Sequence, residues 1–303
     1  MNIFDIFKKF NTQQKCYDHL VEKRWKNKIV CPYCGCEKCG IHNEKTKKRF
    51  ICHQCNKSFS PTVGTIFHNS HIELNKWFIV ISMMLNAKKG ISSCQIARDL
   101  KMRQGTVWSM MKRIRKAMEE SDKNKDLFNS ITEIDEMYIG GKANNKHMSK
   151  RIELKGKHTQ TPIIGLLDRN NKQVIVKSVN NVNQKEVLPI IYNNVKENSL
   201  IITDESNLYK TGIGNSYCHR TVNHSANEYS KKMSFKDKIV NITTNSIEGF
   251  WSSIRRGIIG QFHHISKNYL QFYINEFTYR YNNKNNKNVF EDLISNCVNI
   301  RTN

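Results

Sequence analysis

Cysteines paired at C-x-x-C spacing constrain the first part of the chain more than any other feature. Cys31 and Cys34 form one pair, and Cys52 and Cys55 form another, with seventeen residues between the pairs. Thiolates at two such turns can meet at one Zn²⁺ ion, which accepts four sulfurs in a tetrahedron. The spacing therefore predicts a zinc ribbon over residues 1–65, with one structural Zn²⁺ held by these four cysteines.

A third pair, Cys36 and Cys39, lies in the loop directly after the first. Gly35 and Gly40 bracket it and the loop is short, so we favour the other two pairs as the zinc ligands. The chain has ten cysteines, and charges interrupt any apolar signal-peptide core in its first ten residues. We therefore expect a cytoplasmic protein with reduced thiols rather than a disulfide framework.

The charge balance points to a polyanionic partner. Lys and Arg number 49 against 26 Asp and Glu, a formal net charge of +23 that is spread along the chain. Charge alone does not distinguish DNA, RNA or an anionic membrane surface. The most apolar run, from Trp77 to Leu85, is about half the length that a membrane-spanning helix needs, so it predicts a buried helix. We expect no membrane partner.

Residues 66–125 carry the pattern of a helix-turn-helix. Ile96, Ala97 and Leu100 make one short apolar stripe, and after a break Val107 begins a second stripe at helical spacing. The second helix presents polar and basic side chains that can reach base edges in a major groove, namely Arg103, Gln104, Thr106, Ser109, Lys112 and Arg113. The alternative is a helical hairpin used only for packing.

From residue 126 the pattern changes to strands and helices. Apolar runs of strand length occupy residues 131–139, 161–167, 173–179 and 200–203, and a helical pattern from Gln184 to Lys196 precedes the last of them. The turn at 168–171 makes the first three strands antiparallel. A further strand at 217–222 and a helix at 244–258 follow. This order predicts an α/β ribonuclease-H-like (integrase-type) core over residues 126–303.

Two acids fall on neighbouring strands of this core. Asp135 lies within the first strand, and Asp204 follows the short apolar strand at 200–203. Mg²⁺ (or Mn²⁺) prefers oxygen ligands, and two such ions can clamp the attacking and leaving oxygens of a phosphodiester. Acids in salt bridges or turns are nevertheless commoner than catalytic ones.

The helix at 244–258 offers a third group. Asn245, Glu248 and Arg255 share one face, opposite an apolar face, and Glu248 lies two turns before Arg255. A carboxylate there can bind metal while the guanidinium binds a phosphate. The alternative is a solvated face. Trp251 is expected in the core rather than stacked on a base.

Three blocks of sequence, ITEIDEMYIGGK, IITDES and TTNSIEGFWSSIRRGIIGQFHHIS, follow the predicted zinc ribbon and helix-turn-helix. Together they resemble bacterial insertion-sequence transposases of the zinc-ribbon group related to Merlin transposons. The resemblance covers essentially the whole chain and implies a DDE catalytic core, binding of terminal inverted repeats, and DNA strand transfer. It makes Asp135 the first acid and Asp204 the second.

The third position in this family is acidic or asparagine, and we choose Glu248 over Asn245 because a carboxylate binds Mg²⁺ better than an amide. Two metal ions would activate water to cut the element's end, and the freed hydroxyl would attack target DNA. A basic loop from Lys142 to Lys157, including Lys146, and the arginines Arg255 and Arg256 would contact double-stranded DNA.

The resemblance also implies a homo-oligomer assembled on DNA and a nucleoid-associated location. Two other functions remain open from the residues. The chain could be a transcription regulator whose C-terminal region only dimerises, or a ribonuclease-H-like nuclease that does not join strands.

Overall fold

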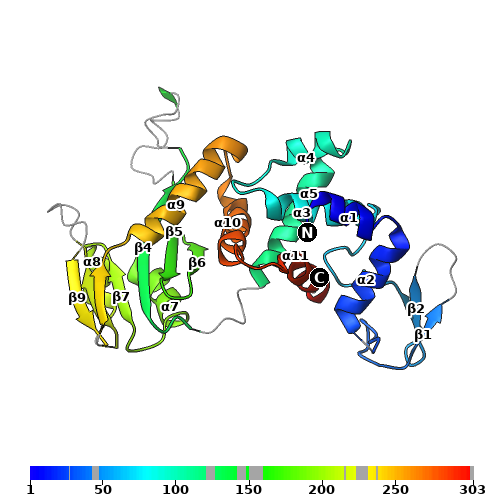
Figure 1. The fold of residues 1–303 in the computed structure, drawn as a ribbon, viewed down its shortest axis with the longest axis horizontal. Helices are drawn as coiled ribbons and strands as arrows, with labels where there is room; N and C mark the ends of the chain where they lie inside the picture. The colour runs from blue at the N-terminus through cyan, green and yellow to red at the C-terminus, as the bar shows by residue number, and fades with distance from the viewer. Residues whose placement is uncertain are drawn as a thin grey trace. The chain divides into compact units, whose positions relative to one another are not determined.

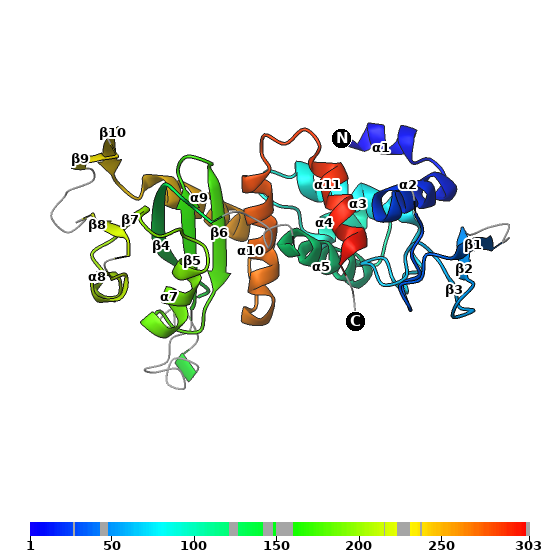
Figure 2. The ribbon, with the colours of Figure 1, turned by 90° about the horizontal axis from the view of Figure 1, so that it is seen from below.

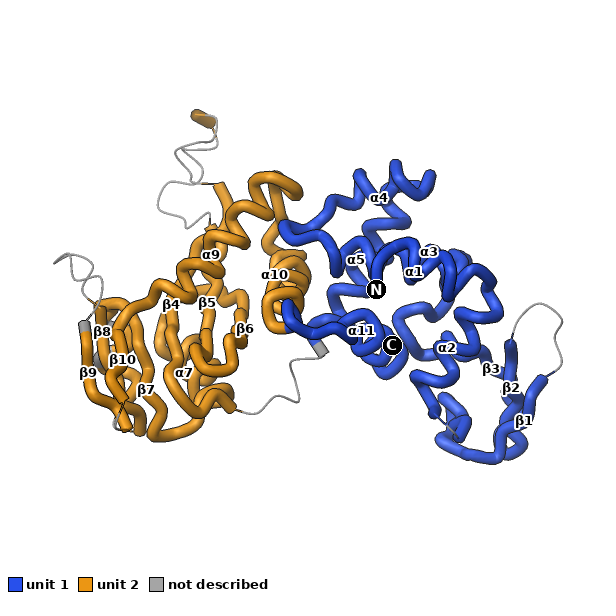
Figure 3. The backbone as a smooth tube through the Cα atoms, viewed as in Figure 1, with its two compact units in different colours: residues 1–123, 283–303 blue, residues 124–282 orange. Residues whose placement is uncertain are grey.

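The computed structural model describes residues 1–26, 28–42, 48–120, 127–141, 148–149, 160–214, 216–222, 231–236 and 238–300. The chain forms two compact units, which Figure 3 distinguishes by colour. The first consists of Met1–Lys123 with Asn283–Asn303, and the second of Asn124–Asn282. The predicted domain 126–303 is thus divided differently in the structure, since its last residues belong to the first unit.

The first unit is mainly helical with one small sheet. Its elements, labelled in Figures 1 and 2, are α1 (Ile3–Lys9), α2 (Gln13–Trp25), β1 (Cys39–His42), β2 (Arg49–Cys52), β3 (Ser58–Phe59), α3 (Leu74–Asn86), α4 (Ser93–Asp99), α5 (Gln104–Glu120) and α11 (Val289–Asn299). The three strands form an antiparallel sheet in the order β1-β2-β3. The helices α4 and α5 occur where the helix-turn-helix pattern predicts two helices.

Helix α3 forms the centre of the first unit. It contains the apolar run from Trp77 to Leu85 and buries side chains around most of its circumference, which is the behaviour of a core helix. Phe78 packs edge-on against Phe10 of the segment after α1 and against Phe290 of α11. The buried helix predicted from the sequence is therefore confirmed. No described helix is long and apolar enough to cross a membrane.

Helix α11 explains why residues 283–303 belong to the first unit. Its apolar face carries Phe290, Leu293, Ile294, Cys297 and Val298, and the helix packs against α2, α3 and α5. Glu291, on its first turn, pairs with Lys9 of α1 and Lys23 of α2 at 2.9 and 3.0 Å. These contacts come from tertiary packing that a pattern along the sequence does not show.

The second unit is built on a mixed five-stranded sheet in the order β6-β5-β4-β7-β8. Strands β4 (Ile131–Ile139), β5 (Thr161–Asp168) and β6 (Gln173–Ser178) are consecutive and antiparallel. Strands β7 (Leu200–Thr203) and β8 (Cys218–Thr221) run parallel to β4 on its other side. The order follows the sequence prediction and is consistent with a ribonuclease-H-like core.

Helices cover both faces of this sheet, as Figures 1 and 2 show. On one face, Ile134 and Ile201 pack with α7 (Gln184–Tyr192) and α8 (Asn207–Gly212). On the other, Met137 and Ile163 pack with α9 (Asn245–Gly257) and α10 (Lys267–Asn282), and the π-helix η2 (Ile258–Phe262) continues α9. Since side chains alternate along a strand, β4 supplies both layers.

A two-stranded hairpin, β9 (Lys231–Phe235) and β10 (Lys238–Ile242), was not predicted from the sequence. Only Val240 and Ile242 of β10 are buried, and they pack against the apolar residues Leu200 and Ile202 of β7. The hairpin therefore leads the chain from the sheet edge back to the start of α9.

Candidate functional site

Three carboxylates meet where β4 and β7 lie side by side. These strands are parallel with Glu133 opposite Ile202, so Asp135 and Asp204, each two residues further on, come together. Oxygen atoms of Asp135, Asp204 and Glu136 lie within 4.8 Å of one another. The structure thus brings the two predicted strand acids together and adds Glu136.

Asp135 is held in place by α9. The indole Nε1 of Trp251 donates a hydrogen bond of 2.9 Å to Asp135 Oδ2. Burial is the main cause that raises the pKa of Asp135, and the charges of Asp204 and Glu248 raise it further, while the Trp251 hydrogen bond opposes the shift. Trp251 is 2% exposed, so it is a core residue, as expected.

Space for the Trp251 ring comes from Gly165 on β5. Gly165 is the register partner of Asp135, and a Cβ atom built on it would lie 2.5 Å from Trp251 Cη2. A side chain at this position would therefore occupy the place of the indole ring. The bare glycine backbone lets α9 approach the sheet closely enough for the indole to reach Asp135.

Glu136 projects toward the opposite helix layer. The hydroxyl of Tyr209 on α8 donates a hydrogen bond to Glu136 Oε1. Burial raises the pKa of Glu136 to about 7, and the charges of Asp204 and Asp135 act in the same direction. The sequence analysis does not single out Glu136, whose position on β4 faces the opposite side of the sheet from Asp135. Its position directly after a predicted metal ligand was the one signal available.

The third predicted acid, Glu248, lies on the first turn of α9 and is exposed. Its Oε1 accepts a hydrogen bond of 2.8 Å from Thr244 Oγ1. Its charge acts on Asp135, although it is not part of the close group of three carboxylates. Asn245, the alternative, is the first residue of α9 and is also exposed.

A buried ion pair fixes the start of α9. Glu133 is fully buried on β4, pairs with Arg169, and accepts the backbone N–H of Ile247 at 2.9 Å. Arg169 also donates to the carbonyls of Asn241 and Thr243, just before the helix. A carboxylate at a helix N-terminus is favourable because it satisfies a free N–H and opposes the helix dipole. This anchor sets the position of Glu248 relative to Asp135.

Two predicted DNA-contacting arginines lie in the last turn of α9. Arg255 and Arg256 are both exposed. Arg256 donates to the hydroxyls of Ser252 and Ser253 at 2.8 and 3.4 Å, one turn back along the helix. Lys142, Lys146 and most of the predicted basic loop 142–157 lie outside the described residues.

The four predicted zinc ligands converge. The sulfurs of Cys31 and Cys55 are 3.7 Å apart, and those of Cys34 and Cys52 are 3.6 Å apart. Sulfurs in a tetrahedron about 2.3 Å from a zinc ion would be separated by similar distances. Backbone N–H groups of Cys55 and Gln54 lower the pKa of the Cys52 thiol to about 6, which favours the thiolate that binds metal.

The neighbouring thiols Cys36 and Cys39 do not join this group. The Cys39 sulfur lies 3.5 Å from the Cys36 carbonyl, and Cys39 pairs with Cys52 across the sheet of the ribbon. All the described cysteines are free of disulfide bonds. The choice among the three cysteine pairs therefore agrees with the geometry.

The predicted DNA-reading residues of α5 fall into two groups. Arg103 and Gln104, at the start of the helix, are exposed. Arg113, by contrast, donates to the carbonyls of Ile66 and His68 at 3.0 and 2.8 Å, so it holds the loop before α3. Lys112 lies over the Trp108 ring, 5.8 Å from its centroid.

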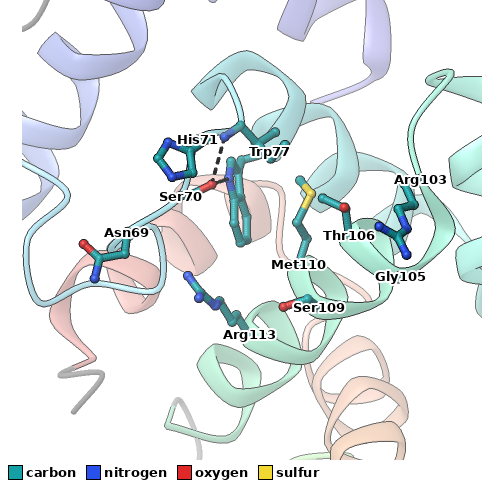
Figure 4. Close-up of a pocket in the computed structure, with 11 residues that line it drawn as sticks. Asn69, Ser70, His71, Trp77, Arg103, Gly105, Thr106, Ser109, Met110 and Arg113 are labelled. Carbon is teal, nitrogen blue, oxygen red and sulfur yellow. Dashed lines mark hydrogen bonds between the residues drawn. The ribbon is translucent and has the colours of Figure 1, made fainter.

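Between this loop and α5 lies a cavity of about 500 Å³, shown in Figure 4. Thr106, Ser109 and Arg113 border it from α5, and Asn69, Ser70 and His71 border it from the loop. Several predicted DNA-reading side chains thus share a polar hollow with a loop that the sequence pattern did not include.

Comparisons with known proteins agree with this arrangement. Residues 128–282 match a family described as the ISXO2-like transposase domain, and residues 11–58 match the transposase zinc-ribbon domain. An uncharacterized protein in transposable element ISH50 of Halobacterium salinarum is 22% identical over 67% of this chain and 70% of its own length. An uncharacterized transposase-like protein of Haemophilus influenzae is 29% identical over 35% of this chain and 77% of its own length. Because the match to the ISXO2-like transposase domain spans more than half of the chain, this protein belongs to the ISXO2-like transposases.

Proposed function

We propose that this transposase cuts DNA at the ends of an insertion sequence and joins those ends to target DNA, using divalent metal ions. The observation that carries the proposal is the meeting of Asp135, Glu136 and Asp204 on neighbouring strands of the matched domain. Hydrolysis and joining of phosphodiesters need negative ligands that hold cations beside the reacting phosphate.

The residues present fit Mg²⁺ or Mn²⁺. Their donor atoms are carboxylate oxygens, the ligands that these cations prefer. Burial raises the pKa of Asp135 and of Glu136, and the neighbouring carboxylates raise both further, so a bound cation would favour the charged forms. Two divalent ions, when bound, supply positive charge that stabilises the attacking and leaving oxygens of phosphoryl transfer.

The chain's own residues hold and position the groups that the reaction needs. Asp135 and Asp204 hold the cations, and Trp251 keeps Asp135 in position through its hydrogen bond. Glu248, on the anchored first turn of α9, supplies the third carboxylate, while Asn245 beside it is the alternative. Glu136 supports the cluster from the other side of β4, where Tyr209 orients it.

The N-terminal unit would recognise the terminal inverted repeats. A zinc ribbon and two helices would provide the binding surface, and Arg103, Gln104 and Thr106 at the start of α5 would contact bases. The net charge of +23 favours binding to the DNA backbone. Assembly of two or more copies would bring both element ends together, and the protein would act at the nucleoid in the cytoplasm.

A strand-transfer assay tests the proposal. Purified protein is incubated with Mg²⁺, labelled element ends and an unlabelled target plasmid. The proposal predicts that labelled ends become covalently joined to the target. A nuclease that does not join strands would release cut ends only, and a transcription regulator would bind the ends without cutting them. Either of those outcomes would contradict the proposal.

The third ligand is tested in the same assay with single substitutions. Glu248→Gln is expected to abolish joining, and Asn245→Ala to reduce it only partly. The reverse result, activity kept by Glu248→Gln and lost by Asn245→Ala, would assign the third position to the asparagine. Loss in Glu136→Gln but not in Glu248→Gln would assign it to Glu136.

A further inference from the structure

The second unit, called the catalytic unit below, has a cavity whose lining begins at Met137, directly after Glu136 of the acidic cluster formed by Asp135, Glu136 and Asp204. It has a volume of about 370 Å³ and is formed by the end of β4, the last turn of α9, η2 and the residues that follow η2. Met137 and Ile139 of β4 line it and are buried, while Ile258 and Ile265 are half-buried. The size is at the small end of the range for small-molecule sites, about 300–1,000 Å³, and suits one nucleotide rather than a duplex.

The side chains at this cavity combine an apolar lining with the positive charge of Arg255. Arg255, His263 and His264 are exposed and contribute to its wall. Among the described residues, none of those lining it is acidic. Ile259, which also lines it, is 71% exposed, so its side chain is accessible to a ligand. This combination suits a ligand with a flat apolar part and a phosphate.

The cavity lies further along α9 and β4 than the acidic cluster. The Ile247 N–H donates a hydrogen bond to Glu133, and the Trp251 indole donates one to Asp135. One turn beyond Trp251, Arg255 lines the cavity together with Met137. The helix and the strand therefore run in the same direction. Arg255 is two turns beyond Glu248, about 10 Å along the helix axis. That length corresponds to about three nucleotide steps of B-form DNA.

The backbone at the cavity is specialised. After α9 the chain forms a π-helix, with the His263 N–H bonded to the Ile258 carbonyl at 2.6 Å. His263 has φ 56°, in the region that residues other than glycine rarely adopt. π-Helices and such φ values occur often at functional sites. Here they end α9 and bring the two histidines to the wall of the cavity.

We propose that this cavity receives one unpaired nucleotide of the DNA end, with its base against the isoleucines and a phosphate at Arg255. The inference rests on the proposed function, since it places the nucleotide a few steps from the phosphate that the acidic cluster holds. Pairing with a complementary base would prevent entry, so the nucleotide must leave the duplex stack. Binding selects for the presence of a base and not for its identity, because the described lining is mainly apolar.

The test compares two DNA ends by fluorescence anisotropy with the full-length protein. One duplex carries the element end with an unpaired terminal nucleotide, and the other has an abasic sugar at the same position. Ca²⁺ replaces Mg²⁺ to prevent cutting. Wild type should bind the base-bearing end about tenfold more tightly, the effect of one stacked or buried base. Equal affinity for the two ends would overturn the proposal.

Matched variants locate the effect. Ile259→Ser should remove the preference for the base, whereas Ile239→Ser, at an isoleucine that is 79% exposed on the β9–β10 hairpin, should keep it. Arg255→Ala should lower the affinity for both DNA ends by the same factor. This factor should be larger than the one caused by Arg256→Ala. Both isoleucines are exposed, so neither change should disturb folding, and thermal melting of each variant checks this. A preference retained in Ile259→Ser would overturn the assignment to this cavity.

Cleavage assays run in parallel with Mg²⁺ separate this proposal from the proposed function. If cutting requires Asp135 and Asp204 but wild type binds the base-bearing and abasic ends with equal affinity, the cavity proposal fails and the transposase function stands. If the base preference is present but no cutting occurs with Mg²⁺ or Mn²⁺, the proposed function fails and the nucleotide site stands.

Discussion

Trp251 Nε1 donates a hydrogen bond of 2.9 Å to Asp135 Oδ2, which joins α9 to the central strand of the catalytic unit. The ring of Trp251 lies over Gly165, the register partner of Asp135. One tryptophan therefore both packs the helix onto the sheet and orients a carboxylate of the acidic cluster. Loss of the hydrogen bond should mainly affect activity, whereas crowding of the Trp251 ring at Gly165 should mainly affect stability.

Trp251→Phe keeps a ring over Gly165 but removes the N–H donor. Since that hydrogen bond lowers the pKa of Asp135, its loss should raise this pKa further. More Asp135 is then protonated at a given pH, so the acidic limb of the pH–rate profile should move to higher pH. Cleavage near neutral pH should fall about tenfold, the effect of one hydrogen bond to a charged group. A profile identical to that of Trp108→Phe, in the other unit, would contradict this role.

Gly165→Ala should destabilise the catalytic unit. The added Cβ would lie 2.5 and 2.6 Å from two atoms of Trp251 and 3.0 Å from Ile247 Cδ1, so the tryptophan and α9 must shift. Overpacking of this kind costs about 1–3 kcal/mol in the free energy of unfolding, measured by urea denaturation. Gly249→Ala is the control, because its added Cβ meets no heavy atom within 4 Å apart from its chain neighbours and its own helix backbone, and alanine favours the helix. Equal stability of the two variants would refute the packing argument.

Glu136 should make the metal-free protein less stable as the pH rises. Its pKa is raised from 4.5 to about 7 in the folded state, so between these values the folded chain binds more protons than the unfolded chain. Stability therefore falls with increasing pH across this window and levels off above it, by up to about 3 kcal/mol. Glu136→Gln keeps an acceptor for Tyr209 and should remove most of this slope.

The measurement for Glu136 is urea unfolding in chelator at about pH 5 and about pH 8, on either side of its folded-state pKa of about 7. Glu136→Gln should be more stable than wild type at the higher pH, and added Mg²⁺ or Mn²⁺ should reduce the difference. Parallel pH dependence in the two proteins would show that Glu136 titrates normally.

Cys34→Ser should lose zinc, whereas Cys36→Ser should retain it. Cys34 belongs to the group of four converging sulfurs, and Cys36, two residues later, does not. Structural zinc contributes directly to folding, so Cys34→Ser should also unfold the ribbon around Phe50 and Phe59 at lower temperature. Metal analysis of the purified proteins measures the zinc content. One equivalent of zinc in both variants would mean that Cys34 is not one of the required zinc ligands.

Much of the catalytic unit could be predicted from local patterns. Apolar runs separated by turn residues identified β4 to β7, and their order brought Asp135 beside Asp204. The amphipathic period of α9 correctly separated the buried residues Ile247 and Phe250 from exposed Glu248. These features depend on residues close together in the sequence.

Other features depend on contacts between distant residues and could not be predicted this way. Alternation along a strand directs Glu136 away from Asp135, yet their carboxylates meet at the point where Asp204 leaves β7. Arg113 has the helical phase of a DNA contact, but the loop carbonyls of Ile66 and His68 accept its hydrogen bonds. The affiliation of α11 with the N-terminal unit likewise follows from tertiary packing.

Metal-dependent cleavage of a labelled element end tests the central claim most directly. Wild type should cut the DNA only when Mg²⁺ or Mn²⁺ is present, and Asp135→Asn and Asp204→Asn should fail to cut at any concentration of either cation while still binding the DNA. Glu205→Gln, next to Asp204 but outside the carboxylate group, should cut normally. Cleavage at the wild-type rate by Asp135→Asn or Asp204→Asn would contradict the account.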